Sequence, residues 1–445
     1  MSTKPNNITL AALLVALLTS GMTTPKAEAQ SGDALLDKLV SKGILSKQEA
    51  DELKKETDSG FEKAYRVKSG LPPWVTSLRI GGDLRLRYDG IYADSGDAED
   101  RSRFRYRLRP FIVATLKDQF EVGLRLTSSD ASGSFGGEPI SGNTSFSDNG
   151  SKKFLYIDMA YAKWSPKVYS DWALTFTGGK MENPLHFPST DVFDKDYTPE
   201  GFAQEVTYKL NSTHSFKLTG VQFVLDELEA ENQDPYLVGG QLRWNGNWTK
   251  EISSTIGATY LSILNDEGLV TVNVPNQGRG NTRTAGGELV YGYDPIIGDA
   301  GVTYTFSKAP LYQGSFPVTV SGDYIYNPSA SENNTGYSVG VSAGKAGKKG
   351  TWQVDYRWTR LEGDAWFEEF PESDFGAFYQ SAPTGGSSGY RYGTNLKGHW
   401  FKGSYAPYDC LTLSVSYFLT ELVNEVPKGS DSGAGRILVD AVWKF

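Results

Sequence analysis

Eight arginines alternate with apolar residues near the start of the chain and could line one surface with positive charge. They occupy odd-numbered positions in three short stretches: Arg79, Arg85, Arg87, Arg103, Arg105, Arg107, Arg109 and Arg125. Three acids share this parity there, Asp83, Asp89 and Glu121, so the local positive excess is five. Side-chain rings of one sign set the ion preference of a pore, so we predict pore-lining arginines. The alternative is that they pair with acids from other segments and act as structural links.

A polar segment near residues 182–201 carries a second charged set. Its acids are Asp191, Asp194, Asp196 and Glu200. Several carboxylates together suit Ca²⁺, but the segment lacks the full pattern of a calcium-binding loop, and we predict no metal and no cofactor. If the segment is a constriction loop inside a pore, acids opposite an arginine wall would produce a transverse field.

Residues suited to other chemistry are few. The imidazole bases are His186, His214 and His399, and none belongs to a recognisable Ser or Cys nucleophile motif, so we predict no enzyme. The single cysteine, Cys410, excludes an intrachain disulfide. A net charge of -9 gives no support to nucleic-acid binding.

The arginines need strands to position them, and the apolar pattern supplies these. Leu84, Leu86 and Tyr88 occupy even positions between the odd-numbered charges, a period of two. A soluble sandwich would alternate similarly, but the runs reach about ten residues, the length that crosses a bilayer as a tilted strand. The chain is 13% aromatic, holds 49 glycines and has a mean hydropathy of -0.40. These features favour an all-β transmembrane antiparallel barrel.

Short turns alternate with long polar loops along the chain, as in outer-membrane barrels. Seven short turns join eight hairpins, which predicts sixteen strands, with eighteen as the alternative. Residues 286–293 also look like a strand, but we assign them to the fifth long loop because one extra strand would make the total odd. We place the turns at 117–118, 167–170, 211–213, 249–250, 310–315, 348–349 and 407–408.

The first residues read as an export signal. Lys4 precedes an apolar run from Ile8 to Leu18, and Ala27-Glu28-Ala29 is a cleavage site, so residues 1–29 are expected to be a signal peptide. Residues 30–74 predict a periplasmic leader of two short helices and a Pro-rich linker. The barrel then spans residues 75–445, and its location is the bacterial outer membrane, reached through the periplasm.

The last residues alternate up to an aromatic end. Trp443 and Phe445 resemble the C-terminal signature by which the barrel assembly machinery of Gram-negative bacteria recognises its substrates. We therefore assign these two residues to an assembly signal.

Several blocks resemble the putative porin family of Gram-negative bacteria. They are residues 39–49 (LVSKGILSKQE), 179–184 (GKMENP), 193–201 (FDKDYTPEG), 352–357 (WQVDYR), 362–365 (EGDA), 373–376 (SDFG) and 393–395 (GTN). A Gly-rich insert at 384–389 departs from the pattern.

The resemblance implies a porin-like barrel and passive transport. The predicted function is a water-filled channel for small hydrophilic solutes or ions, with a preference for anions from the arginine excess. The alternative is a non-conducting structural or adhesin barrel. The expected partners are outer-membrane lipid, the assembly machinery and diffusing solutes, with a homotrimer carried over from porin-like families.

Overall fold

The computed structural model describes residues 71–93, 100–131, 135–229, 233–275, 278–377, 393–425 and 431–445. The chain divides into two compact units, residues 1–77 and 78–445, and of the first unit only residues 71–77 are described. The predicted signal peptide, helical leader and Gly-rich insert all lie outside the described residues.

The described residues form one large antiparallel sheet. Its strands are Val75–Ala93 (β1), Arg101–Leu116 (β2), Phe120–Ser128 (β3), Thr144–Ser145 (β4), Leu155–Trp164 (β5), Trp172–Lys180 (β6), Glu200–Lys209 (β7), His214–Val224 (β8), Tyr236–Asn247 (β9), Ile252–Leu264 (β10), Ile296–Phe306 (β11), Phe316–Tyr326 (β12), Thr335–Gly344 (β13), Thr351–Leu361 (β14), Leu396–Tyr408 (β15), Leu411–Leu422 (β16) and Ala434–Lys444 (β17). Three one-turn 3-10 helices are Lys117–Gln119 (η1), Asp148–Gly150 (η3) and Asp266–Gly268 (η4).

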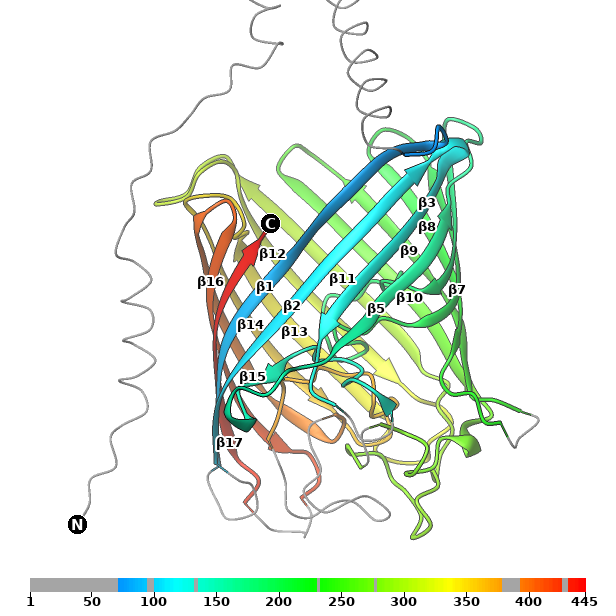
Figure 1. Cartoon of the computed structure of the whole chain (residues 1–445), viewed down its shortest axis with the longest axis vertical. Helices are drawn as coiled ribbons and strands as arrows, with labels where there is room; N and C mark the ends of the chain where they lie inside the picture. The colour runs from blue at the N-terminus through cyan, green and yellow to red at the C-terminus, as the bar shows by residue number, and fades with distance from the viewer. Residues whose placement is uncertain are drawn as a thin grey trace, which may run out of the picture. The chain divides into compact units, whose positions relative to one another are not determined.

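The sheet closes into a barrel because β1 pairs with both β2 and β17. The two-residue strand β4 pairs with β2, whereas β3 pairs directly with β5. Of the 17 strands, β4 is therefore an addition to the wall, which leaves sixteen wall strands as predicted. Figure 1 shows the tilted strands with short turns at one end and long loops at the other.

The turns lie close to the predicted positions. Six of the seven fall between consecutive strands as expected, and the last is displaced from 407–408 to 409–410 because β15 continues to Tyr408. Residues 286–293 lie in the long connection between β10 and β11, which confirms their assignment to the fifth loop.

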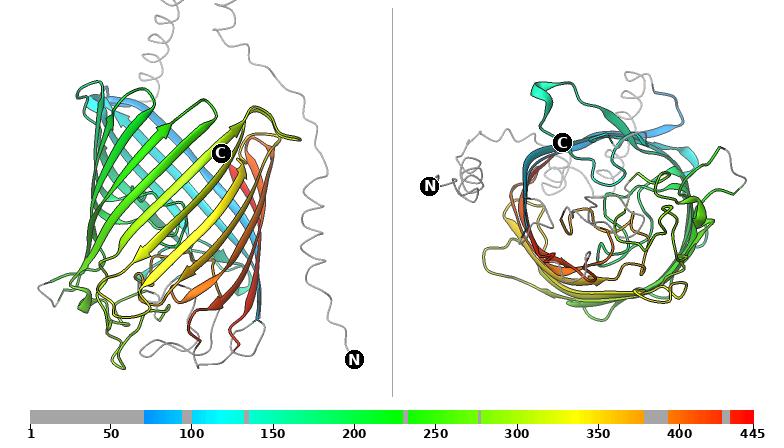
Figure 2. Two further views of the ribbon diagram at one scale, coloured as in Figure 1. Left: turned by 180° about the vertical axis from the view of Figure 1, so that it is seen from behind. Right: turned by 90° about the horizontal axis from the view of Figure 1, so that it is seen from below.

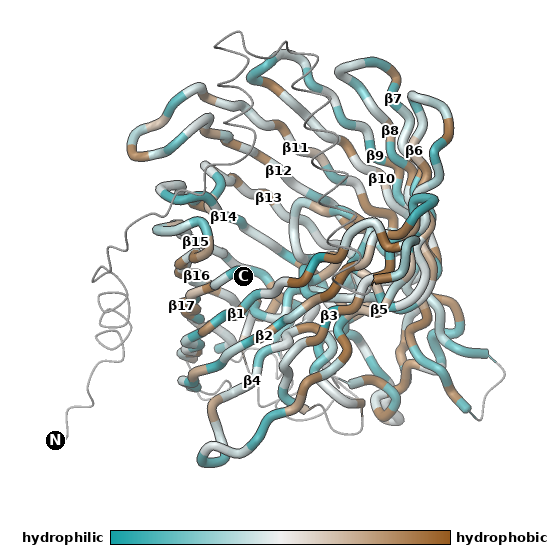
Figure 3. Tube along the Cα trace, turned by 45° about the horizontal axis from the view of Figure 1, so that its top comes forward, coloured by the Kyte–Doolittle hydropathy of each residue, from teal (hydrophilic) through white to brown (hydrophobic). Residues whose placement is uncertain are grey.

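The barrel has the inside-out polarity of a transmembrane barrel. On β1 the apolar Ile80 and Leu86 are 73% and 40% exposed, whereas Arg85, Arg87 and Asp89 are buried. Figure 3 shows the resulting alternation of hydrophilic and hydrophobic residues along the strands. Among the described residues, no helix is long and apolar enough to cross a membrane.

Three long loops fold together at one end of the barrel. We call them L3 (residues 181–199), L5 (265–295) and L7 (362–395, described except for 378–392). They share a hydrophobic core with the inward apolar side chains of β7 to β12, and its largest member is the fully buried Trp366 of L7. The view along the barrel in Figure 2 shows loop segments inside the ring of strands. This core lies on the side of β7 to β12, whereas the eight arginines singled out in the sequence belong to β1, β2 and β3.

Candidate functional site

The eight predicted arginines lie on the inner face of β1, β2 and β3. Successive side chains of a strand point to opposite faces. The apolar residues at even-numbered positions are exposed on the outside, so the arginines at odd-numbered positions face inward. Burial differs along the set: Arg85, Arg87, Arg105 and Arg107 are buried, whereas the side chain of Arg79 is 64% exposed.

Seven of these eight arginines have a carboxylate partner within ion-pair distance. Arg87 pairs with Asp374 and Asp440, Arg103 and Arg105 with Asp89, Arg107 and Arg109 with Asp83 and Asp196, Arg105 also with Asp130, Arg125 with Asp158, and Arg79 with Glu121. Most of these partners come from strands and loops far away in the sequence. Most of these arginines therefore fit the alternative interpretation, in which they pair with acids from other segments and act as structural links.

The predicted excess of five charges is wrong for the folded chain. Arg436 joins the cluster, and its partners are Asp89 and Asp374. Nine arginines thus face eight carboxylates: Asp83, Asp89, Glu121, Asp130, Asp158, Asp196, Asp374 and Asp440. Lys163 of β5 also pairs with Glu121. Among the described residues, the positive excess of this cluster is therefore two rather than five, because five of these acids lie outside the three stretches that carry the arginines.

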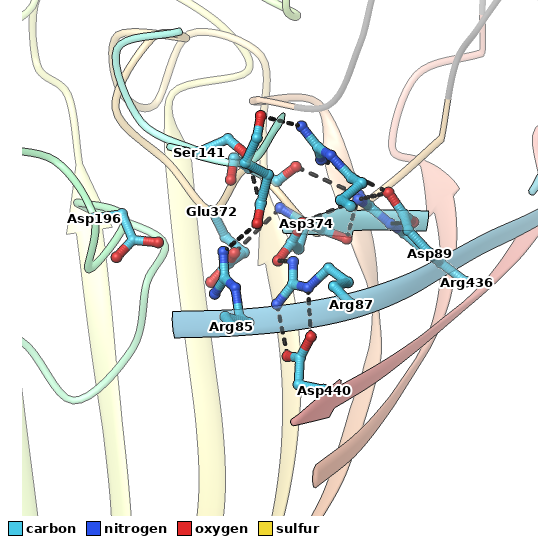
Figure 4. A network of polar contacts seen from close by, with 12 residues as sticks. Arg85, Arg87, Asp89, Ser141, Asp196, Glu372, Asp374, Arg436 and Asp440 are labelled. Carbon is cyan, nitrogen blue, oxygen red and sulfur yellow. Dashed lines mark hydrogen bonds and ion pairs between the residues drawn. The ribbon is translucent and has the colours of Figure 1, made fainter. Parts of the chain in front are cut away.

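The most buried part of the cluster joins the barrel seam to L7. Arg87 of β1 donates from Nε and Nη2 to the two carboxylate oxygens of Asp440 of β17, at 2.7 and 2.8 Å. Arg87 also donates to Asp374 of L7 at 2.6 Å, and Arg436 donates to the other Asp374 oxygen at 2.9 Å. Figure 4 shows this network around Arg87. One carboxylate of L7 therefore bridges two strands that meet where the barrel closes.

Arg85 is the exception within the wall. Its guanidinium donates to the side-chain amide oxygen of Asn143 at 2.7 Å, and it has no ion pair among the described residues. Its Nε is buried without a hydrogen-bond partner.

L3 crosses the lumen and contacts several parts of the wall. The carbonyl of His186 accepts from Arg243 of β9 at 2.7 Å, and that of Pro188 accepts from Arg357 of β14 at 2.9 Å. Further along, the carbonyl of Val192 accepts from the indole of Trp366 in L7 at 2.7 Å. L3 therefore runs from β9 to β14 and then to L7, inside the barrel.

The four predicted loop acids have different surroundings. Asp196 accepts from Arg109 at 3.1 Å and from Arg107, so it alone contacts the arginine wall. Asp194 accepts from the backbone N–H groups of Asp196 and Ser373, both at 2.8 Å, and links L3 to L7. Asp191 faces β14, where the hydroxyl of Thr359 donates to it at 3.2 Å.

The placement of Glu200 corrects the prediction. It is the first residue of β7, is exposed, and pairs with Lys180 at the end of β6 at 3.0 Å. Its parity is opposite to that of the buried, inward Ala203, so it belongs to the outer face. Of the four acids expected to produce a transverse field across the pore, Asp196 is therefore the one that faces the arginine wall.

The loop carboxyls divide into two electrostatic groups. Burial, with added repulsion from Asp323, raises the pKa of Asp191 to about 8. Burial and the nearby Glu372 likewise raise the pKa of Asp194 well above its usual range. Burial acts in the same direction on Asp196, but the positive charges of Arg107 and other arginines outweigh it and lower its pKa. Asp196 is thus held as a carboxylate, whereas Asp191 and Asp194 favour the protonated form.

A cavity of about 520 Å³ lies beside the first residues of L3. Side chains of β5 to β9 and of residues 181–186 line it, including Tyr161, Lys217 and His186. Its cations have partners: Lys217 pairs with Glu205 at 3.3 Å and Arg243 with Asp299 at 2.6 Å. Among the described residues, no group of three or more His, Cys, Asp or Glu side chains could hold a metal ion.

Sequence reasoning missed several members of the charged cluster. Asp374, Asp440 and Arg436 were visible in the sequence, and the parity of β17 places the last two on its inner face. The sequence analysis did not use the pairing of β17 with β1. This pairing brings Asp440 beside Arg87, although the two residues are 353 positions apart in the sequence. Applying barrel closure to the last strand could have found this pair.

Comparison with known proteins agrees with the barrel fold. Residues 92–278 match the family model described as putative porin. The resemblance to putative porins expected from the sequence is confirmed over these residues. The high-pH structure of Pseudomonas putida OprB has a TM-score of 0.50 and 11% identity to this chain, and the match covers 87% of this chain and 97% of that chain.

A double mutant of the porin of Rh. blastica has a TM-score of 0.40 and 12% identity, covering 83% of this chain and 100% of that chain. No curated protein matches the chain. The likeness to OprB shows a shared barrel fold, so the function of this chain has to be argued from its own residues.

Proposed function

We propose that the chain forms a water-filled channel in the bacterial outer membrane, through which small hydrophilic solutes and ions diffuse passively with a preference for anions. The observation that carries this proposal is a closed barrel with an apolar exterior and a wall of charged side chains inside. Guanidinium and carboxylate groups on that wall favour a hydrated path. An enzymatic role has no comparable support among the residues that bear chemistry.

The path is expected to follow the charged side of the lumen. The core shared by L3, L5 and L7 occupies the side of β7 to β12, and packed apolar side chains leave little room for water. Solutes would therefore pass along β1 to β3 and β15 to β17. Residues at the tip of L3 lie against this side, since Asp196 contacts Arg107 and Arg109.

A non-conducting structural or adhesin barrel is the second candidate. The same core favours it, because three loops already fold together within the barrel. Under either candidate the expected partners are outer-membrane lipid and the barrel assembly machinery, and a homotrimer is our proposal for the assembled state.

Planar-bilayer recording of the purified, folded protein separates the two candidates. A channel gives stepwise increases in conductance after addition of protein, and a gradient of KCl then gives a reversal potential whose sign reports anion preference. Protein unfolded by heating before addition is the control. Folded protein that inserts into the bilayer without conductance steps would favour the structural barrel.

A further inference from the structure

Lys195 occupies the tip of a turn in L3. The backbone N–H of Tyr197 donates to the carbonyl of Asp194 at 3.1 Å, which closes the turn around Lys195 and Asp196. Both neighbours are anchored, Asp194 by Ser373 of L7 and Asp196 by Arg107 and Arg109 of β2. The side chain of Lys195 is exposed. The turn is therefore anchored on both sides, and its ammonium group has no ion pair within the part of the chain that the structure describes.

Lys402 presents a second ammonium group from the wall. It lies on β15 directly across from Asp355 of β14, so both side chains are on the same face. The buried Asp355 accepts two hydrogen bonds from Gln353, at 2.8 and 3.0 Å, and makes no ion pair with Lys402. Lys402 is partly buried, and its Nζ lies 6.0 Å from the centre of the Trp400 ring.

The two lysines act on each other. The positive charge of Lys195 acts on Lys402 more strongly than the charges of Asp440, Asp355 and Arg87 do. Asp440 is already held by two hydrogen bonds from Arg87. Among the described residues neither lysine has an ion pair, in contrast to most of the arginines of β1 to β3. Two like charges that are not held in ion pairs in a hydrated lumen raise the local concentration of mobile anions.

We propose that Lys195 and Lys402 form the anion-recruiting site of the channel and take small inorganic anions or carboxylates as they pass L3. This inference rests on the proposed channel function and names the residues that give it its charge preference. Apart from Arg85, the arginines of β1 and β2 contribute little to the net charge of the pore, because carboxylates at fixed positions balance their charges.

The test compares Lys195→Gln, Lys402→Gln and the double variant with wild type in planar bilayers containing a KCl gradient. A single charge about 7 Å from a passing ion, in water and with screening at 0.1 M salt, changes the permeability ratio about 1.5- to 2-fold. We therefore expect the chloride-to-potassium permeability ratio to fall about twofold in each single variant and about threefold in the double variant. At 1 M salt the differences should nearly disappear.

Two matched variants serve as controls. Lys195→Arg keeps the charge and should keep the permeability ratio. Lys250→Gln removes an exposed lysine from the turn between β9 and β10 and should leave the ratio unchanged. Thermal unfolding in detergent establishes that each variant is folded.

The outcomes separate this inference from the proposed function. Wild-type protein that inserts without conducting overturns both. Wild-type protein that conducts, with the same permeability ratio in the folded double variant at 0.1 M salt, overturns the lysine site and leaves the channel intact. A loss of anion preference in Lys195→Gln with retention in Lys195→Arg supports the site.

Discussion

Asp191 should make the stability of the protein fall as pH rises. Its carboxyl is 6% exposed and lies near Asp323 of β12, with Thr359 and Arg357 of β14 as its favourable neighbours. Burial, then repulsion from Asp323, raises its pKa to about 8. An aspartate in the unfolded chain has a pKa of about 3.9. The folded protein therefore binds a proton over a pH range in which the unfolded chain has lost it.

Linkage between protonation and folding determines how the free energy of unfolding changes with pH. Stability from this group is fully present below about pH 3.9 and is lost as pH rises towards about 8, because the unfolded state releases the proton first. Each pKa unit corresponds to about 1.4 kcal/mol, so a shift of about four units gives an upper limit of about 6 kcal/mol. The observed loss should be smaller, because Asp323 can take part of the proton.

The variant Asp191→Asn stays neutral and can still accept a hydrogen bond from Thr359. We expect it to unfold like wild type at pH 4 and to be more stable than wild type at pH 9, by up to a few kcal/mol. Urea unfolding in detergent at pH 4, 6, 8 and 9 measures this, with Asp118→Asn at an exposed turn as control. Parallel stability curves for wild type and Asp191→Asn over this range would refute the reasoning.

Three further predictions concern assembly, the arginine wall and L3. Phe445→Asp should reduce outer-membrane levels sharply, as Western blots of membrane fractions would show. Its backbone hydrogen bonds with Gly82, at 2.8 and 3.1 Å, survive the substitution, but the exposed aromatic ring of the predicted assembly signal is replaced by a charge. Replacing Arg105, Arg107 and Arg109 with Ala should lower the thermal midpoint by about 10 °C or more, since breaking buried pairs costs about 3–5 kcal/mol. Deleting residues 188–198 should raise single-channel conductance but also lower thermal stability, because the segment supplies part of the loop core; unchanged conductance would place it away from the path.

The wall of the barrel was predictable because it is a local property. Side chains alternate between the two faces of any strand, so Leu86 and Arg87 could be assigned to opposite faces from the sequence. Turn positions follow from the same local pattern, and the single displaced turn, at 409–410, differs by two residues. Strand number then follows from counting turns and from the even number that closure between periplasmic ends requires.

The charge balance of the lumen was not predictable in this way. Counting parity in β1, β2 and β3 found the arginines but missed Asp158, Asp374 and Asp440, which lie on other strands and on L7. The role of the two lysines was missed for the same reason: Lys195 and Lys402 are unremarkable in the sequence and are distinguished by having no ion pair among the described residues.

The sequence by itself determined which residues form strands, which face each side chain takes and how many strands close the wall. These depend on contacts between neighbours along the chain and on steric rules with a period of two. Only the tertiary structure decided which charges meet. Asp440 reaches Arg87 because β17 closes on β1, and Asp196 reaches Arg107 because L3 folds inward. Electrostatic energy depends on distance in space rather than along the chain, so local sequence could supply the charges but not their balance.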